Sequence, residues 1–388
     1  MLRFLTAGES HGPALAAILE GLPAGVPLVE DDINVHLQRR QRGFGSGGRM
    51  RIERDRVRFL SGVWNGRTTG APITLEIENR DWANWKDKDI RPMTIPRPGH
   101  ADLTGAIKYG YRELRLALER ASARETAARV AVGAICQRLL AEFDILIGSY
   151  VVQIGVTKVE LPDDLPYAER FAHAEENDVR CPVPAAADSL HACIRQAMSV
   201  KDTLGGIFEV VALHVPPGLG SHVHWDRRLD ARLMAAVGSI QAIKGVEIGP
   251  AFENAARYGT QVHDEIFATG GQLTRDTNRA GGFEGGITTG QPIVIRAAMK
   301  PISTTLTPLR SVDLATGQPA TTRYERSDTC AVPRATVVGE AMTAFVLADS
   351  LLEKLGGDSL AELEPRYSAL RRGALEELEM DNVSWRFR

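Results

Sequence analysis

Cysteine is scarce in this sequence. Four cysteines occur among 388 residues, and no two of them form a C-x-x-C pair. This scarcity excludes a disulfide framework and is typical of reduced thiols in a cytosolic protein. We expect no metal site either, because the alternating pair His222 and His224 has no obvious third ligand.

Long apolar runs and a strong net charge are also missing. No stretch approaches the roughly 20 apolar residues of a membrane span, and residues 1–5 lack the pattern of a signal peptide. The formal net charge is −3, so the surface as a whole should seek neither nucleic acid nor membrane. We expect a cytoplasmic protein in which any anion binding comes from a local cluster.

No low-complexity linker divides the chain, and only residues 161–184, rich in proline and acidic residues, read as a surface excursion. Residues 66–75 resemble residues 286–295: in each, a Thr-Thr-Gly turn leads into a β-branched strand. A long helix is expected some tens of residues after each strand, over 123–142 and 334–354. Chance similarity of a short turn is the alternative. We predict an α+β fold, a single-domain β-α-β sandwich of two antiparallel sheets and helices. It would span 1–388, with interleaved halves and an internal pseudo-twofold repeat.

Basic side chains gather between residues 39 and 56, around a glycine loop at residues 43–48 that matches G-x-G-x-x-G. A dinucleotide-binding fingerprint needs a strand before the loop and a helix after it. Here a helical pattern over 32–41 precedes the loop and a strand pattern over 50–59 follows, so a Rossmann fold is disfavoured. The cluster consists of Arg39, Arg40, Arg42, Arg49, Arg51, Arg54 and Arg56.

A mobile glycine loop flanked by guanidinium groups is the better interpretation, because arginine binds phosphate and carboxylate oxygens in bidentate fashion. A solvated basic face is the plain alternative. A nucleic-acid site is a more specific alternative. However, such sites usually add aromatic residues for stacking, and Phe44 is the only one in this segment.

Two histidines lie in glycine-bounded loops. His11 lies between Gly8 and Gly12, and His100 follows Pro98 and Gly99. Such loops hold a side chain in one orientation and let a ligand approach, and histidine can act as acid or base near neutral pH. Each histidine is a candidate for proton transfer, although a lone histidine is more often structural.

The long helix over 123–142 begins with a Ser-x-x-Glu pattern. Ser122 would be the N-cap and Glu125 the third helical residue of a capping box. Arg120 and Arg124 beside this helix start would add positive charge to a helix terminus that already favours anions.

Together these segments resemble the chorismate synthase family. Besides the two histidine loops (8–12 and 97–102), the similar segments are 118–126, 202–206, 241–249, 278–282, 300–304 and 326–330. The resemblance spans nearly the whole chain. It implies a lyase of the shikimate pathway, which serves aromatic amino acid biosynthesis. The enzyme would catalyse 1,4-anti-elimination of phosphate from 5-enolpyruvylshikimate 3-phosphate with reduced FMN. It also implies a homotetramer, with NADPH only as an indirect reductant through an external flavin reductase.

The resemblance implies a role for individual positions. His11, His100 and Asp328 match catalytic positions. Positions that contact flavin correspond to Arg120, Ala121, Ser122, Gln241, Ala242, Gly285, Lys300, Pro301, Ile302, Ser303, Thr304 and Arg326. Substrate-side positions correspond to Ser10, Arg40, Ser46 and Arg49. Ser46 stands where the family usually has arginine, so a catalytically impaired relative that binds flavin or polyanions is a second hypothesis.

Overall fold

The computed structural model describes residues 1–46, 54–323 and 327–386. It combines α-helices with antiparallel sheets, which confirms the predicted α+β class. The helices are α1 (Glu30–Gln41), α2 (Asp102–Tyr109), α3 (Arg115–Ala121), α4 (Thr126–Ala141), α5 (Tyr167–Glu176), α6 (Ala187–Ser199), α7 (Leu229–Gly238), α8 (Ala251–Asn254), α9 (Val332–Leu355) and α10 (Leu360–Ser368).

The strands of the first half are β1 (Arg3–Ala7), β2 (Ala14–Glu20), β3 (Val57–Ser61), β4 (Val63–Trp64), β5 (Arg67–Thr68) and β6 (Ile73–Glu78). The later strands are β7 (Leu146–Ile154), β8 (Thr157–Lys158), β9 (Gly206–Leu213), β10 (Ile243–Ile248), β11 (Ile266–Thr269), β12 (Gln272–Arg275), β13 (Phe283–Glu284), β14 (Ile287–Thr288), β15 (Ile293–Met299), β16 (Arg310–Asp313) and β17 (Gln318–Thr321).

The first large sheet has the strand order β1-β2-β6-β3, with antiparallel pairing throughout. Successive side chains of a strand point to opposite faces, and the apolar residues of β2 and β6 alternate accordingly. One face is therefore buried and packs against α4. Its buried side chains include Leu15, Ala17, Leu19, Ile73, Leu75 and Ile77.

The second large sheet has the order β10-β15-β9-β7-β8 and is also antiparallel. Phe208 and Val210 of β9 belong to the main hydrophobic cluster. On the opposite face, Tyr150 and Val211 form a smaller cluster together with Phe171 of α5. This sheet is thus buried on one face by the core helices and partly covered on the other.

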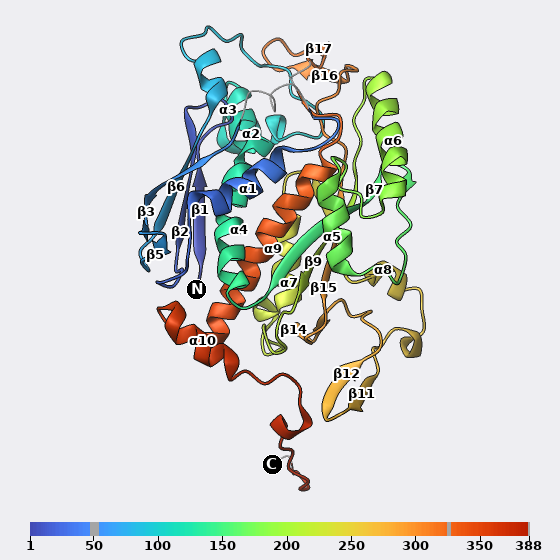
Figure 1. Cartoon of the computed structure of the whole chain (residues 1–388). Helices are drawn as coiled ribbons and strands as arrows, with labels where there is room; N and C mark the ends of the chain where they lie inside the picture. The colour runs from blue at the N-terminus through green and yellow to red at the C-terminus, as the bar shows by residue number, and fades with distance from the viewer. Residues whose placement is uncertain (47–53, 324–326, 387–388) are drawn as a thin grey trace.

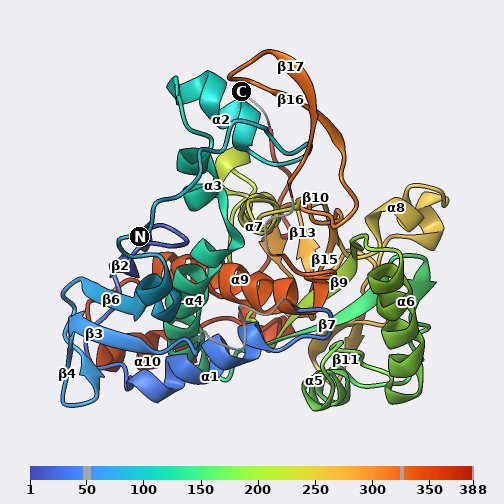
Figure 2. The ribbon, with the colours of Figure 1, turned by 90° about the horizontal axis from the view of Figure 1, so that it is seen from above.

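Helices α4 and α9 pack against each other between the two sheets (Figures 1 and 2). A Cβ added at Gly133 of α4 would lie 2.3 Å from the Cα of Ala341 in α9, so glycine is what allows this close approach. Among the described residues, α9 alone is long and apolar enough to cross a membrane by length and composition. However, 94% of its apolar 18-residue stretch is buried inside the fold, which is the environment of a core helix.

The two halves of the chain share a common order of elements once insertions are left out. That order is two strands, a helix, a strand, a short hairpin, a last strand and a core helix. The insertions are α2 and α3 in the first half, and β8, α5, α6, α8, β11, β12, β16 and β17 in the second. The matching elements are β1, β2, α1, β3, β4–β5, β6 and α4 in the first half. In the second half they are β7, β9, α7, β10, β13–β14, β15 and α9. The strand orders β1-β2-β6-β3 and β7-β9-β15-β10 also match, apart from the added β8.

The two Thr-Thr-Gly turns share the same hydrogen bonds. Thr68 Oγ1 donates to the carbonyl of Pro23 at 2.6 Å, and Thr288 Oγ1 donates to the carbonyl of Pro216 at 2.7 Å. Each hydroxyl also accepts the backbone N–H three residues beyond that proline, at 3.0 and 2.9 Å. Both turns lead into a strand, as the sequence predicts.

Two local predictions were wrong. Residues 161–184 are not only a surface excursion, because they contain α5 and the fully buried Val179. The capping box at Ser122 does not form. Ser122 Oγ accepts from the Arg124 backbone N–H at 3.3 Å, but the carboxylate of Glu125 accepts from Thr6 and Arg129 instead. The guanidinium of Arg129 offers a charge-assisted bond, which is stronger than a neutral backbone one.

Candidate active site

A cavity of about 860 Å³ is lined by residues next to the first turns of α4 and α9. Ala123, in the 3₁₀ turn before α4, and Ala331, the N-cap residue of α9, both line it. Two helix N-termini therefore face the same space, and each favours an anion there. Most of the predicted site residues also line this cavity, namely Ser10, His11, Arg40, His100, Ala121, Ser122, Gln241, Ala242, Lys300, Ile302, Ser303, Thr304 and Asp328.

His11 is held by a glutamate that the sequence did not single out. Its Nδ1 lies 2.8 Å from Glu119 Oε1, and its backbone N–H donates to Glu119 Oε2 at 2.8 Å. The indole of Trp85 lies against the imidazole, with ring centroids 4.1 Å apart. Although burial opposes it, the hydrogen bonds and charge of His11 hold the pKa of Glu119 below its usual range. The carboxylate is therefore ionised at neutral pH.

His100 is held in the same way by Asp102. Its Nδ1 lies 2.6 Å from Asp102 Oδ1 and 3.0 Å from Arg97 Nη2. Because a carboxylate can only accept, the shorter contact requires a proton on Nδ1. Burial opposes ionisation of Asp102, but hydrogen bonds from His100 and Arg97 hold its pKa well below the usual range. Both histidines thus use Nδ1 for a carboxylate, and both line the cavity.

The turn at Lys300 is joined to the His100 loop. Lys300 Nζ donates to the carbonyl of Gly99 at 3.1 Å and to Ser303 Oγ at 3.0 Å. Ser303 Oγ donates to the same carbonyl at 2.7 Å. Arg97 Nη1 completes the connection by donating to Thr304 Oγ1 at 3.0 Å. The two segments, predicted separately, form one wall of the cavity.

Three arginines and two aspartates form a connected group beside the cavity. Arg124 Nη1 donates to both oxygens of Asp55 at 2.6 and 2.7 Å, and Arg334 forms an ion pair with Asp328. Arg40 Nη1 is buried and has no hydrogen-bond partner among the described residues, although Asp55 Oδ2 lies 3.6 Å away. Burial and then the neighbouring Arg334 lower the pKa of Arg40 to about 9. An anion bound here would give Arg40 Nη1 a hydrogen-bond partner, and its negative charge would raise the pKa of Arg40 again.

The cavity as a whole has more positive than negative side chains. Among the described lining residues the cationic ones are Arg40, Lys88, Arg97, Arg124, Lys300 and Arg334, and the acidic ones are Asp81 and Asp328. Asp55 and Asp102, behind the lining, pair with Arg124 and Arg97. Because three of the arginines are almost fully buried, the remaining positive charge is poorly screened by water. The lining therefore suits an anionic ligand.

Gln241 and Ala242 supply backbone and amide groups at the remaining edge. Gln241 Nε2 donates to Glu125 Oε2 at 3.1 Å, while its Oε1 is buried without a partner among the described residues. Ala242 has a φ of 68°, which is unusual for a residue with a Cβ. Its carbonyl accepts from the Lys300 backbone N–H at 2.9 Å. Such local strain is typical of functional sites.

Several predicted residues lie elsewhere. Arg120 is not among the lining residues, because its guanidinium donates to the backbone carbonyls of Thr6 and Gly8. Ser46 Oγ donates to the carbonyl of Gly43 at 2.6 Å and does not line the cavity. Pro301 does not line it either, although its neighbours on both sides do.

Gly285 is on the hairpin β13–β14, at the opposite end of β15 from Lys300 (Figure 1). The structure therefore does not bring Gly285 to the cavity of its own chain. Arg49 and Arg326 lie outside the described residues.

The arginine cluster is not one binding surface. Within its described part only Arg40 lines the cavity. Arg39 is turned to the other side of α1, where it binds Glu340 and Glu175, and Arg54 and Arg56 are exposed. Adjacent residues of a helix project about 100° apart, so Arg39 and Arg40 cannot serve one ligand. The sequence alone did not identify Arg334, Trp85 and Glu119 as site residues. Each of them contacts a site residue that is distant in the sequence.

A cavity with two carboxylate-held histidines and an excess of buried cations belongs to an enzyme that acts on a small anionic molecule. The comparisons with known proteins agree. A family model described as chorismate synthase matches residues 2–352. The chorismate synthase of Aquifex aeolicus is 56% identical over 386 residues, covering 94% of this chain and 96% of that protein.

The chorismate synthase of Chlorobaculum tepidum is 55% identical, covering 96% of this chain and 98% of that protein. A crystal structure of a chorismate synthase superposes with a TM-score of 0.79 at 50% identity, covering 95% of this chain and 96% of that one. The chain belongs to the chorismate synthase family. It is accordingly an enzyme of this type, a lyase that removes phosphate.

Proposed function

We propose that the chain converts 5-enolpyruvylshikimate 3-phosphate into chorismate by 1,4-anti-elimination of phosphate, with reduced FMN as cofactor. One observation carries the proposal: both histidines and the buried cations line a single cavity in a chain of this family. The substrate has one phosphate and two carboxylates. That charge pattern suits Arg40, Arg124 and Arg334 together with the two helix N-termini.

The described residues fit a flavin. The buried, unpartnered Oε1 of Gln241 can accept a hydrogen bond from a ring N–H, and Ser122 and Ala242 line the same space. The volume of about 860 Å³ is within the range of cofactor and ligand cavities. When bound, a reduced flavin would supply transient electron density for cleaving a C–H bond that is not activated by a neighbouring carbonyl. NADPH would serve only as an indirect reductant, through an external flavin reductase.

Three side chains would handle protons. With a proton on both ring nitrogens, His11 would protonate the departing phosphate from Nε2, while its Nδ1–H stays bonded to Glu119. His100 would hold a proton at the flavin, also from Nε2, while Asp102 fixes the other side of its ring. Asp328 would help to move the proton that reaches the flavin N5, and its ion pair with Arg334 would keep the carboxylate in place. General acid–base help of this type contributes about 10²–10⁴-fold per group.

We also propose a homotetramer. Strand β15 has seven residues, a length of roughly 20 Å at about 3.3 Å per residue. Gly285 precedes this strand and Lys300 follows it, so we infer that the Gly285 next to a flavin at Lys300 comes from another copy. Support comes from the outer face of the first sheet, where Leu5, Ile18 and Leu60 are 74%, 43% and 54% exposed. Such an apolar face suits an interface.

The finer features of the fold are part of the same proposal. The matched strand orders and the matched bonds of Thr68 and Thr288 support a β-α-β sandwich with an internal pseudo-twofold repeat. The hydrophobic cluster that includes Leu19, Val130, Phe208 and Leu347 supports one domain over 1–388 with interleaved halves. We place the enzyme in the cytoplasm, in keeping with its free, largely buried cysteines.

Flavin difference spectra and turnover test the function together. Under anaerobic conditions the protein is mixed with photoreduced FMN, then with substrate, and the flavin spectrum and chorismate are followed. We expect a spectral change that needs both protein and substrate, and turnover with reduced but not oxidised FMN. Absence of chorismate with fully reduced flavin would refute the proposal.

A further inference from the structure

Glu119 contacts the His11 loop through three separate atoms. Its Oε1 lies 2.8 Å from His11 Nδ1, its Oε2 accepts the His11 backbone N–H at 2.8 Å, and its backbone carbonyl accepts the Ser10 N–H at 3.1 Å. The carboxylate is only 14% exposed. A glutamate that only needed a partner for its charge could pair with any cation. Here both carboxylate oxygens face N–H groups of the same histidine.

We propose that Glu119 is a positioning residue for His11, fixing a proton on Nδ1 and presenting Nε2 to the ligand in the cavity. The carboxylate offers acceptors only, and both of its oxygens face N–H donors of the same residue. His11 can therefore neither swap its ring protonation nor turn its ring without losing one of these bonds. The role assigned to Nε2 rests on the proposed function.

Two neighbours keep this geometry rigid. The indole of Trp85 covers the imidazole at 4.1 Å between centroids, and the guanidinium of Arg115 lies 5.5 Å from the centroid of the same indole. Arg115 Nη1 is also 3.9 Å from Glu119 Oε1, from the previous turn of α3. The ring is thus held by a carboxylate on one edge and by an indole on one face. Glutamate, histidine, indole and guanidinium form one packed unit beside the cavity.

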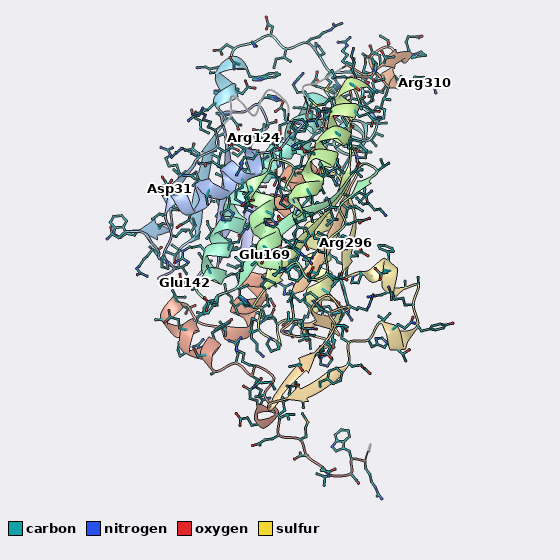
Figure 3. The ribbon with its side chains drawn as sticks, turned by 45° about the vertical axis from the view of Figure 1, so that its right-hand side comes forward. Asp31, Arg124, Glu142, Glu169, Arg296 and Arg310 are labelled. Atoms are coloured by element: carbon teal, nitrogen blue, oxygen red, sulfur yellow. The ribbon has the colours of Figure 1, made fainter. Side chains whose placement is uncertain are left out.

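Glutamine is the appropriate replacement because it has the size of glutamate but only one acceptor oxygen. In Glu119→Gln, one of the two His11 donors must face an amide NH₂ group, which cannot accept. The ring then loses its fixed orientation or its Nδ1 proton. Glu142→Gln is the matched control, since Glu142 pairs with Arg138 at the far end of α4 (Figure 3).

A double-mutant cycle separates positioning from a merely structural role. Four proteins are compared: the wild type, Glu119→Gln, His11→Ala and the double variant. We expect Glu119→Gln to lower kcat by at least about tenfold, but by no more than His11→Ala, whose loss is bounded by the roughly 10²–10⁴-fold effect of an acid–base group. In the His11→Ala background, Glu119→Gln should change kcat by less than about twofold, because both changes remove the same function.

The proposal would be overturned if the kcat losses of the two single variants multiplied in the double variant, or if Glu119→Gln were fully active. Glu142→Gln should match the wild type in either background.

A second readout does not depend on turnover. In ¹⁵N-histidine-labelled protein, with His11→Ala to assign the signal, we expect Nδ1 of His11 to be protonated, whether Nε2 also carries a proton or not. In Glu119→Gln the signal should change to the Nε2–H form or to a mixture. A neutral Nε2–H form in the wild type would contradict the inference even if chorismate is made. If the His11 signal were as expected but the protein made no chorismate, the proposed function would be wrong and the role of Glu119 in holding His11 would stand.

Discussion

Arg97 and Thr304 are 207 positions apart in the sequence, yet Nη1 of the arginine donates to Oγ1 of the threonine at 3.0 Å. The same guanidinium makes two bonds to Asp102, at 2.8 and 3.0 Å, and Arg97 is only 6% exposed. This one side chain therefore connects the carboxylate behind His100 to the turn that begins at Lys300. The relative position of these two candidate flavin-contacting segments depends on it.

Replacing Arg97 tests this connection. Arg97→Met would leave Asp102 as a buried carboxylate whose remaining partners are His100 and the backbone N–H of residue 97. Breaking a buried ion pair in this way costs about 3–5 kcal/mol. We expect urea unfolding to show a loss of this size and reduced FMN to bind more weakly. Arg310→Gln, at an exposed site of β16 (Figure 3), should change neither quantity. Wild-type flavin affinity in a folded Arg97→Met protein would contradict the connection.

The two histidines should affect turnover rather than stability. Their side chains are 18% and 20% exposed at the cavity, so truncation creates no closed void in the core. We expect His11→Ala and His100→Ala each to lower kcat about 10²–10⁴-fold, with melting temperatures close to the wild type. Full activity in both variants would mean that the histidines are structural.

Ser46 tests the hypothesis of an impaired relative. Its hydroxyl is bonded to Gly43 and does not line the cavity, whereas Arg40, Arg124 and Arg334 do. Because these arginines already supply the cationic wall, we expect Ser46→Arg to change kcat/KM by less than about threefold, well under the 10²-fold effect of a missing acid or base. A gain approaching that size would show instead that the natural enzyme lacks an important anion contact.

Acid should destabilise the protein through Glu340 and Glu175, which share Arg39 and Arg180. Burial opposes ionisation, but the arginines hold the pKa of Glu340 below its ordinary value and that of Glu175 at about 2. Groups with depressed pKa values stabilise the fold above their unfolded pKa, here 4.5. They lose that contribution as pH falls through the folded value.

We therefore expect the free energy of unfolding to fall between about pH 5 and pH 2, in line with this linkage. Glu340→Gln should remove part of that slope and cost about 3–5 kcal/mol at pH 7, because two arginines lose a buried partner. The measurement is a series of urea titrations at each pH. A pH-independent free energy over this window would contradict the assignment.

Much of the fold could be predicted from the sequence, because the signals were local. The apolar period of α4 and the proline and glycine at the ends of α9 gave both core helices to within a few residues. Residues 161–184 were misinterpreted because prolines suggested a loop. Pro166 in fact precedes the first residue of α5, a position where its fixed φ is compatible with a helix start.

The candidate site was harder to predict, because its chemistry comes from pairs that only tertiary structure brings together. Asp328 and Arg334 are close in sequence, but Arg334 also donates to the carbonyl of Arg40, 294 positions away. Sequence spacing could not show that Arg39 and Arg40 point to different partners, or that Glu119 would turn towards His11. The glycine-bounded loops indicated the histidines, and the family resemblance supplied their roles and the Lys300 turn. The carboxylates that hold the histidines were found only in the structure.

The proposed flavin-dependent elimination of phosphate is tested most directly by the stoichiometry of one anaerobic reaction. Enzyme with reduced FMN is mixed with a limiting amount of 5-enolpyruvylshikimate 3-phosphate, and phosphate, chorismate and flavin oxidation state are measured together. For an elimination without net redox change, we expect one phosphate per chorismate, with the flavin still reduced at the end. Phosphate released without chorismate, or flavin oxidised in proportion to product, would contradict it.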